Sequence, residues 1–160
     1  MSYKTLLGRL IKMSRFMVST IIAYPQEEVF NNFIKLAKEP FNKFNENNPI
    51  GARTKRVARK TKSGDLYIET IVTDYIKNNV YETKTSFLGS KYTGRYEFKD
   101  VGDDCTEVLL IESQDMYGII NKIGFLFQSI TAKKKIKRKL DNTIQALEKR
   151  IIKERNKIMK

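Results

Sequence analysis

The strongest constraint on the fold is a β-rich middle region that only short turns interrupt. From residue 53 to residue 113 the chain is rich in Val, Ile, Thr and Tyr, which favour strands. Turn-forming clusters such as Lys77-Asn78-Asn79 and Gly89-Ser90 divide this region. Connections this short join antiparallel neighbours, so the region predicts an antiparallel sheet. The expected strands are 53–61, 66–76, 80–88, 92–99 and 106–113.

The strand expected at 92–99 alternates strictly between two kinds of residue. Its polar residues fall on one face, and its aromatic and small residues fall on the other. The second face consists of Tyr92, Gly94, Tyr96 and Phe98. A period of two is typical of a strand with one face buried. We therefore expect something to cover one side of the sheet.

Helical patterns flank the β-rich region. Residues 16–23 are apolar and β-branched and predict a first strand. Pro25 and the acidic residues after it favour a helix start, and Pro40 marks its end. From Ile136 to Ile151 apolar residues recur every three or four positions, which predicts a long amphipathic C-terminal helix. This order predicts an α+β fold whose long helix covers the concave face of a curved antiparallel sheet.

The length favours one domain, and we expect it to span residues 16–160. Residues 1–15 are expected to be a basic amphipathic extension. Three interpretations of this segment are open: a short helix on an anionic membrane, a helix packed on the domain, or a frayed extension. A fourth is that Met13 or Met17 is the true start. The apolar helical face in this segment consists of Leu6, Leu7, Leu10 and Ile11.

Composition excludes several chemistries. The chain has no His and one Cys, so His-based nucleophilic triads, His-ligated zinc and an internal disulfide are all excluded. Cys105 is expected to be an ordinary reduced thiol. No apolar run is long enough to span a membrane. We expect no metal, no cofactor and no catalytic residue set.

Four segments, taken in order, resemble the START-like superfamily of polyketide cyclases and plant pathogenesis-related allergens. They are a strand running into AYPQEEVFNNF (16–33), VTDYIKNNVYETKT (72–85), CTEVLLIE (105–112) and GFLFQSITAKKKIKRKLDNTIQALE (124–148). Within the superfamily they look like a bacterial domain-of-unknown-function family. The resemblance implies a helix-grip fold with an apolar cavity between sheet and helix. It also implies ligands such as lipids, sterols, quinones or polyketide-like molecules, and it transfers no catalytic residues.

Aromatic residues on the covered face are the candidates for lining that cavity, because ligand pockets are mostly apolar with a few polar groups. The alternative is that they simply fill the core. Glu112 shares strand parity with Val108 and Leu110, so an inward carboxylate with a raised pKa could act as an acid or base. The cavity candidates are Tyr81, Phe87, Tyr92, Tyr96, Phe98, Glu112, Ile123 and Phe127.

Positive charge is concentrated rather than spread. The formal net charge is +13, and six basic residues with no acidic residue fall between Arg53 and Lys62. A second run lies on the predicted C-terminal helix. Such a surface attracts phosphate, and the alternative is an ordinary solvated face. The residues expected to contact an anionic surface are Lys133, Lys134, Lys135, Lys137, Arg138 and Lys139.

These patterns favour a non-enzymatic cytoplasmic protein that binds a hydrophobic small molecule or lipid and contacts anionic membranes peripherally. One alternative is a basic interaction domain that binds a membrane, a protein or nucleic acid without a cavity ligand. Sequence-specific nucleic-acid binding is not favoured, because no recognition motif is present. Another alternative is an enzyme of the cyclase or dehydratase kind.

Overall fold

The computed structural model describes residues 12–116 and 122–159, and at 12–14, 115–116 and 122–130 it describes the backbone alone. Within these ranges the chain forms six strands and two helices. The strands are β1 (Lys12–Ile22), β2 (Arg53–Thr61), β3 (Gly64–Ile76), β4 (Val80–Phe87), β5 (Ser90–Gly102) and β6 (Cys105–Met116). The helices are α1 (Gln26–Ala37) and α2 (Lys122–Ile158).

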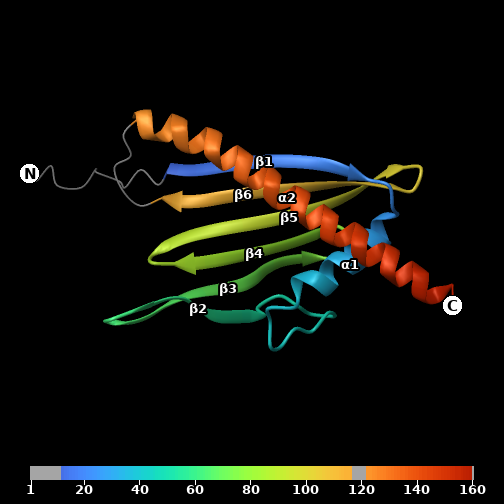
Figure 1. Ribbon diagram of the computed structural model, residues 1–160, viewed down its shortest axis with the longest axis horizontal. Coiled ribbons are helices and arrows are strands. Elements are labelled where there is room, and N and C mark those ends of the chain that lie inside the picture. Colours follow the sequence, from blue (N-terminus) through green and yellow to red (C-terminus); the bar gives the residue numbers. More distant parts are fainter. Residues whose placement is uncertain (1–11, 117–121, 160) are drawn as a thin grey trace, which may run out of the picture.

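All six strands belong to one antiparallel sheet, in the order β1-β6-β5-β4-β3-β2 (Figure 1). The predicted meander and its turns are confirmed. In the turn between β3 and β4, Asn78 adopts a φ of 66°, which asparagine tolerates better than most residues. The amide of Asn79 closes this turn on the carbonyl of Ile76 at 2.9 Å.

The first strand differs from its expected bounds. It begins at Lys12, four residues before the predicted start, because β1 pairs with β6 from Lys12 opposite Met116 to Ile22 opposite Thr106. Residues 12–15 are therefore strand and not part of a basic helix. Leu6, Leu7, Leu10 and Ile11 lie outside the described residues, so the membrane helix and the division at residue 15 stay predictions.

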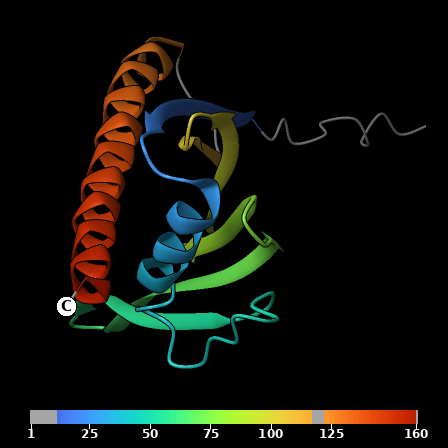
Figure 2. The same ribbon diagram turned by 90° about the vertical axis from the view of Figure 1, so that its right-hand side faces the viewer.

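The sheet curves around the two helices, and α2 runs diagonally across its open side (Figures 1 and 2). The predicted helix-grip architecture is thus confirmed. The core fills the space between the concave face, α1 and α2. Its fully buried apolar members from the sheet are Ile22, Val72, Val108 and Leu110, and those from α2 are Leu140, Leu147 and Ile151.

Helix α1 packs its aromatic side chains against the centre of the concave face. The ring of Phe30 meets that of Phe98 edge-on at 5.2 Å, and the ring of Phe33 lies 4.6 Å from that of Tyr96. The first residue of α1 is also tied to the sheet, since Gln26 Nε2 donates to the carbonyl oxygen of Phe98 at 2.8 Å. These contacts fix the position of α1 on β5.

The C-terminal half of α2 is bound to α1 and to the turn that follows it by ion pairs. Arg155 contacts Glu28 at 2.5 Å, Lys35 contacts Glu154 at 3.6 Å, and Arg150 contacts Glu39 at 3.7 Å. In the part of the chain that the structure describes, no helix has the length and apolar character needed to cross a membrane.

Candidate functional site

A cavity of about 670 Å³ that is open to solvent lies between the sheet, the end of α1 and the middle of α2. This volume falls in the range of sites for small molecules. Its wall is largely aromatic and aliphatic, with hydroxyl groups on the sheet side and cations on the helix side. The lining residues are Phe33, Leu36, Ala37, Pro40, Phe41, Thr70, Tyr81, Thr83, Tyr96, Lys135, Arg138, Lys139, Asn142, Thr143 and Ala146.

The floor of the cavity is the concave face of β3, β4 and β5. Tyr81 lies opposite Tyr96 in the pairing of β4 with β5, and Thr83 lies opposite Gly94. A Cβ atom at Gly94 would stand 3.9 Å from Lys139 Nζ and 3.9 Å from Thr83 Oγ1. The missing side chain of Gly94 therefore leaves room between the sheet and α2.

The two tyrosines on the floor differ in their hydrogen bonding. The Tyr96 hydroxyl lies 3.4 Å from Thr143 Oγ1 on α2. Tyr81 is 4% exposed, and its hydroxyl has no hydrogen-bond partner among residues 12–116 and 122–159. Burial, with a smaller contribution from Tyr96, raises the pKa of Tyr81, so its hydroxyl stays protonated. The wall thus presents a hydroxyl group that is open to water or to a polar group in the cavity.

Three cations line the helix side of the cavity. Lys139 forms an ion pair with Glu112 on β6, whereas Lys135 and Arg138 have no carboxylate partner among the described residues. Burial alone would lower the pKa of Lys139, but the neighbouring Tyr96 and Glu112 raise it above its ordinary value. Lys139 is therefore a matched charge, while Lys135 and Arg138 are unmatched.

Only some of the predicted cavity residues on β4 and β5 line the cavity. Tyr81 and Tyr96 line the cavity, and Phe98, 2% exposed, is packed in the core against Phe30 and Phe33. Tyr92 lies on the same face of β5 but is more exposed, and Phe87 is half-buried at the end of β4; neither lines this cavity.

The remaining candidates come from β6 and α2. Glu112 lies opposite Gly94 on the concave face, as its parity suggested, and the ammonium of Lys139 meets its carboxylate. Ile123 and Phe127 belong to the part of α2 whose side chains lie outside the described residues.

Several lining residues were not singled out from the sequence. Phe33, Leu36 and Ala37 lie on α1, but the sequence pattern does not show which part of that helix meets a cavity. Phe41 belongs to the segment after α1, beyond the helix end expected at Pro40. Thr83 lies on the cavity face between Tyr81 and Thr85, a position that only strand parity could have marked.

The six basic residues between Lys133 and Lys139 on α2 form the basic run. All six are exposed, but they have different surroundings. Lys137 contacts Asp141 at 3.1 Å, one helical turn away. Lys135, Arg138 and Lys139 line the cavity. Lys133 and Lys134 remain on the outer surface, without an ion pair to the described part of the chain.

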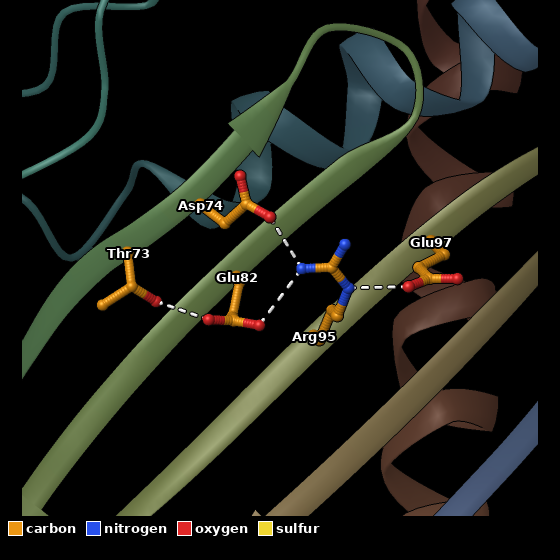
Figure 3. A network of polar contacts seen from close by, with 5 residues as sticks. All are labelled: Thr73, Asp74, Glu82, Arg95 and Glu97. Carbon is orange, nitrogen blue, oxygen red and sulfur yellow. Dashed lines mark hydrogen bonds and ion pairs between the residues drawn. The ribbon is translucent and has the colours of Figure 1, made fainter.

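A second charged cluster lies on the opposite face of the sheet (Figure 3). Arg95 Nη1 donates to Asp74 at 2.7 Å and to Glu82 at 3.2 Å, and Arg95 Nε donates to Glu97 at 2.6 Å. Thr73 Oγ1 donates to the other oxygen of Glu82 at 2.9 Å. The hydrogen bond to Glu97, reinforced by Asp74 and Glu82 against the opposing effect of burial, raises the pKa of Arg95. This cluster clamps β3, β4 and β5 together.

The described side chains show no metal centre, since no three His, Cys, Asp or Glu residues gather among them in a way that could hold an ion. Cys105 is half-buried at the start of β6, with its Sγ 3.4 Å from the carbonyl oxygen of Asp103. The polar groups that line the cavity are hydroxyl groups, the amide of Asn142, and ammonium and guanidinium groups.

A curved antiparallel sheet that grips a long C-terminal helix over a cavity defines the helix-grip, or START-like, class of fold. Residues 17–133 match the family described as a domain of unknown function (DUF3284). The chain belongs to this family, as the resemblance to a START-like domain-of-unknown-function family predicted. No curated protein matches the chain.

Solved structures share this fold at low sequence identity. A protein of unknown function, SA2116 from Staphylococcus aureus, has a TM-score of 0.66 at 9% identity, over 92% of this chain and 98% of its own. Ara h 8.0201 has a TM-score of 0.59 at 12% identity, over 89% and 99%. The Zhui aromatase/cyclase from Streptomyces sp. R1128 has a TM-score of 0.58 at 10% identity, over 88% and 96%. These likenesses concern the fold.

Proposed function

We propose that this protein binds a hydrophobic small molecule or lipid in the cavity between the sheet and α2. The observation that carries the proposal is the cavity itself, about 670 Å³ in volume and walled by Phe33, Tyr81, Tyr96 and the end of α1. Apolar walls with a few placed hydroxyl groups are typical of ligand sites. Burying apolar ligand surface against them would supply most of the affinity.

We propose binding rather than catalysis, because Glu112 and Tyr81 are not free to accept a proton. The charge of Glu112 is matched by Lys139, and the raised pKa of Tyr81 keeps its hydroxyl protonated. A general base needs a free proton-accepting group within reach of its substrate. The cyclase alternative is supported by a shared fold alone, and one fold can host unrelated functions.

Native mass spectrometry followed by organic extraction tests the proposal. We expect a discrete adduct on the wild-type protein that extracts as an apolar molecule. Thr83→Phe should remove the adduct, because the new ring projects from the floor into the space where the apolar ligand would lie. Thr93→Phe is the matched control: it places the same ring on the neighbouring strand, facing away from the cavity, and should retain the adduct.

Uptake of the neutral fluorophore N-phenyl-1-naphthylamine covers the case in which the protein purifies without a ligand. Its fluorescence should rise with the wild type and with Thr93→Phe, and stay low with Thr83→Phe. Circular dichroism must show that both variants fold. Neither adduct nor uptake in the wild type, or equal binding by Thr83→Phe, would overturn the proposal.

Peripheral contact of α2 with an anionic membrane stays a prediction. Lys133 and Lys134 are the members of the basic run that support it best, because they are exposed, unpaired within the described chain and outside the cavity wall. Each basic residue near such a surface contributes about 1 kcal/mol.

A further inference from the structure

The charges around the cavity do not balance. Its wall contains Lys135, Arg138 and Lys139, and no acidic residue is part of it. Glu112 matches Lys139, so two positive charges are left over. Lys135 and Arg138 are three positions apart on α2, which places their side chains on neighbouring parts of the same helix surface.

The edge of the sheet adds positive charge to the same side of the molecule. Arg56 lies opposite Ile68 and Arg59 opposite Leu66, and Thr54 lies opposite the cavity residue Thr70. Since side chains alternate between faces along a strand, Arg56 and Arg59 are on the concave face with Thr70. Two elements that flank the cavity thus raise the positive potential on one side of the sheet.

We propose that the ligand is an amphiphile with an acid group, and that Lys135 and Arg138 hold this group at the mouth of the cavity. This inference rests on the proposed function, because it assigns the polar end of the ligand that the cavity would bind. The apolar body would lie between Phe33, Tyr96 and the end of α1. A carboxylate or a phosphate monoester fits, since a guanidinium can donate two parallel hydrogen bonds to either group.

The hydroxyl of Tyr81 adds a polar group to the wall. Tyr81 lines the cavity, and its hydroxyl makes no hydrogen bond within the described chain. In the described chain the fully buried polar atoms without a partner are Asn32 Oδ1, Asn78 Oδ1 and Arg150 Nε, so the Tyr81 hydroxyl is open to water and can donate to a polar atom of the ligand. The cations decide which head group is preferred, and the apolar wall decides how tightly the ligand is held.

The experiment is a competition assay against bound N-phenyl-1-naphthylamine, with three competitors that share one alkyl chain: dodecanoate, dodecyl phosphate and dodecanol. Each is used below the concentration at which it forms micelles. We expect the wild type to bind the better of the two acids about tenfold more tightly than the alcohol, because two exposed charge pairs act together. The comparison of the two acids shows which group the site prefers.

Paired variants test the assignment to Lys135 and Arg138. Lys135→Gln/Arg138→Gln should bind acids and alcohol about equally. Lys133→Gln/Lys134→Gln removes the same charge from the same helix outside the cavity wall and should retain the preference. Equal binding of acids and alcohol by the wild type would overturn the inference, as would a preference that survives in Lys135→Gln/Arg138→Gln.

The failure of this inference is distinguishable from failure of the proposed function. If dodecanol and the acids compete equally and Thr83→Phe abolishes uptake, the cavity binds ligands without selecting an acid. If native mass spectrometry shows that an acid binds Thr83→Phe as well as it binds the wild type, the acid is held on the surface, and the inference is wrong. If neither the fluorophore nor dodecanol binds the wild type, the proposed function itself is wrong.

Discussion

The two faces of the sheet carry charge in different ways. On the convex face, the guanidinium of Arg95 meets three carboxylates, and all four side chains are partly buried. On the concave side, Lys135 and Arg138 stand at a cavity with no carboxylate partner in the described chain. One region satisfies its charges internally, and the other leaves its charges available.

This difference separates a structural role from a binding role. A charged group that loses its water must be paired, or its burial costs free energy. Arg95 is 26% exposed at its side chain and binds carboxylates on three strands, so it holds these strands together. Lys135 and Arg138 are exposed and keep their water, so they can exchange it for an anionic ligand at little cost.

Replacement of Arg95 is expected to have the largest effect on stability. Arg95→Met leaves Asp74, Glu82 and Glu97 close together without their shared cation, so three hydrogen bonds are lost and the carboxylates repel. We expect the free energy of unfolding in urea to fall by about 2 kcal/mol, a value that allows for partial exposure. Uptake of N-phenyl-1-naphthylamine should be unchanged, because the cluster faces away from the cavity.

Arg53→Met is the matched control for this prediction. Arg53 contacts Glu69 at 3.7 Å, with side chains 65% and 50% exposed, so its loss should cost about 0.5 kcal/mol or less. Adding Glu82→Gln to Arg95→Met should recover part of the lost stability, since it removes one repelling charge. Equal stabilities for Arg95→Met and Arg53→Met would show that the cluster is not a clamp.

Local signals predicted most of the fold. Turn residues such as Asn78 and Gly89 punctuate the sheet, and the alternation of residues 92–99 marks its covered face. The start of β1 at Lys12 was missed because residues 12–15 are mostly polar or basic, and their strand conformation comes from pairing with β6. That pairing joins segments about a hundred residues apart, which no local pattern records.

The candidate site was less predictable for the same reason. Tyr96 and Phe98 share a face of β5, and the sequence alone does not show which of them lines the cavity. The position of α1 decides between them, since Phe98 packs beneath Phe30 while Tyr96 reaches the cavity. Likewise, the basic run looks uniform in sequence, and only the placement of Glu112 distinguishes the matched Lys139 from the unmatched Lys135.

The ion pair between Lys139 and Glu112 is intermediate between the Arg95 cluster, which has three carboxylate partners, and the unpaired Lys135 and Arg138. Its contribution to the free energy of unfolding should depend on pH. Glu112→Gln should lower the free energy of unfolding by about 1 kcal/mol or less near neutral pH, because both groups are partly exposed. The pKa of Lys139 is raised above 10.5 in the folded protein, so the contribution is fully present below that value. It should disappear as the pH rises through the raised pKa.

Urea unfolding of the wild type and Glu112→Gln at about pH 8 and about pH 11.5 measures this difference, and taking the difference cancels the titration of other groups. Asp141→Asn serves as the control, because its partner Lys137 is 70% exposed and the pair should contribute almost nothing at either pH. A gap between wild type and Glu112→Gln that persists at the higher pH would contradict the assignment to Lys139.

The smallest effect on stability is expected where the effect on binding is largest. Lys135→Gln/Arg138→Gln breaks no ion pair within the described chain and removes two charges from a crowded basic run. Its free energy of unfolding should lie within about 0.5 kcal/mol of the wild-type value, or above it, since substitutions away from specific contacts are nearly neutral. Residues kept for a ligand often bring no stability to the free protein. A loss of about 2 kcal/mol, as expected for Arg95→Met, would instead place these cations among the structural charges and remove the contrast between the two faces.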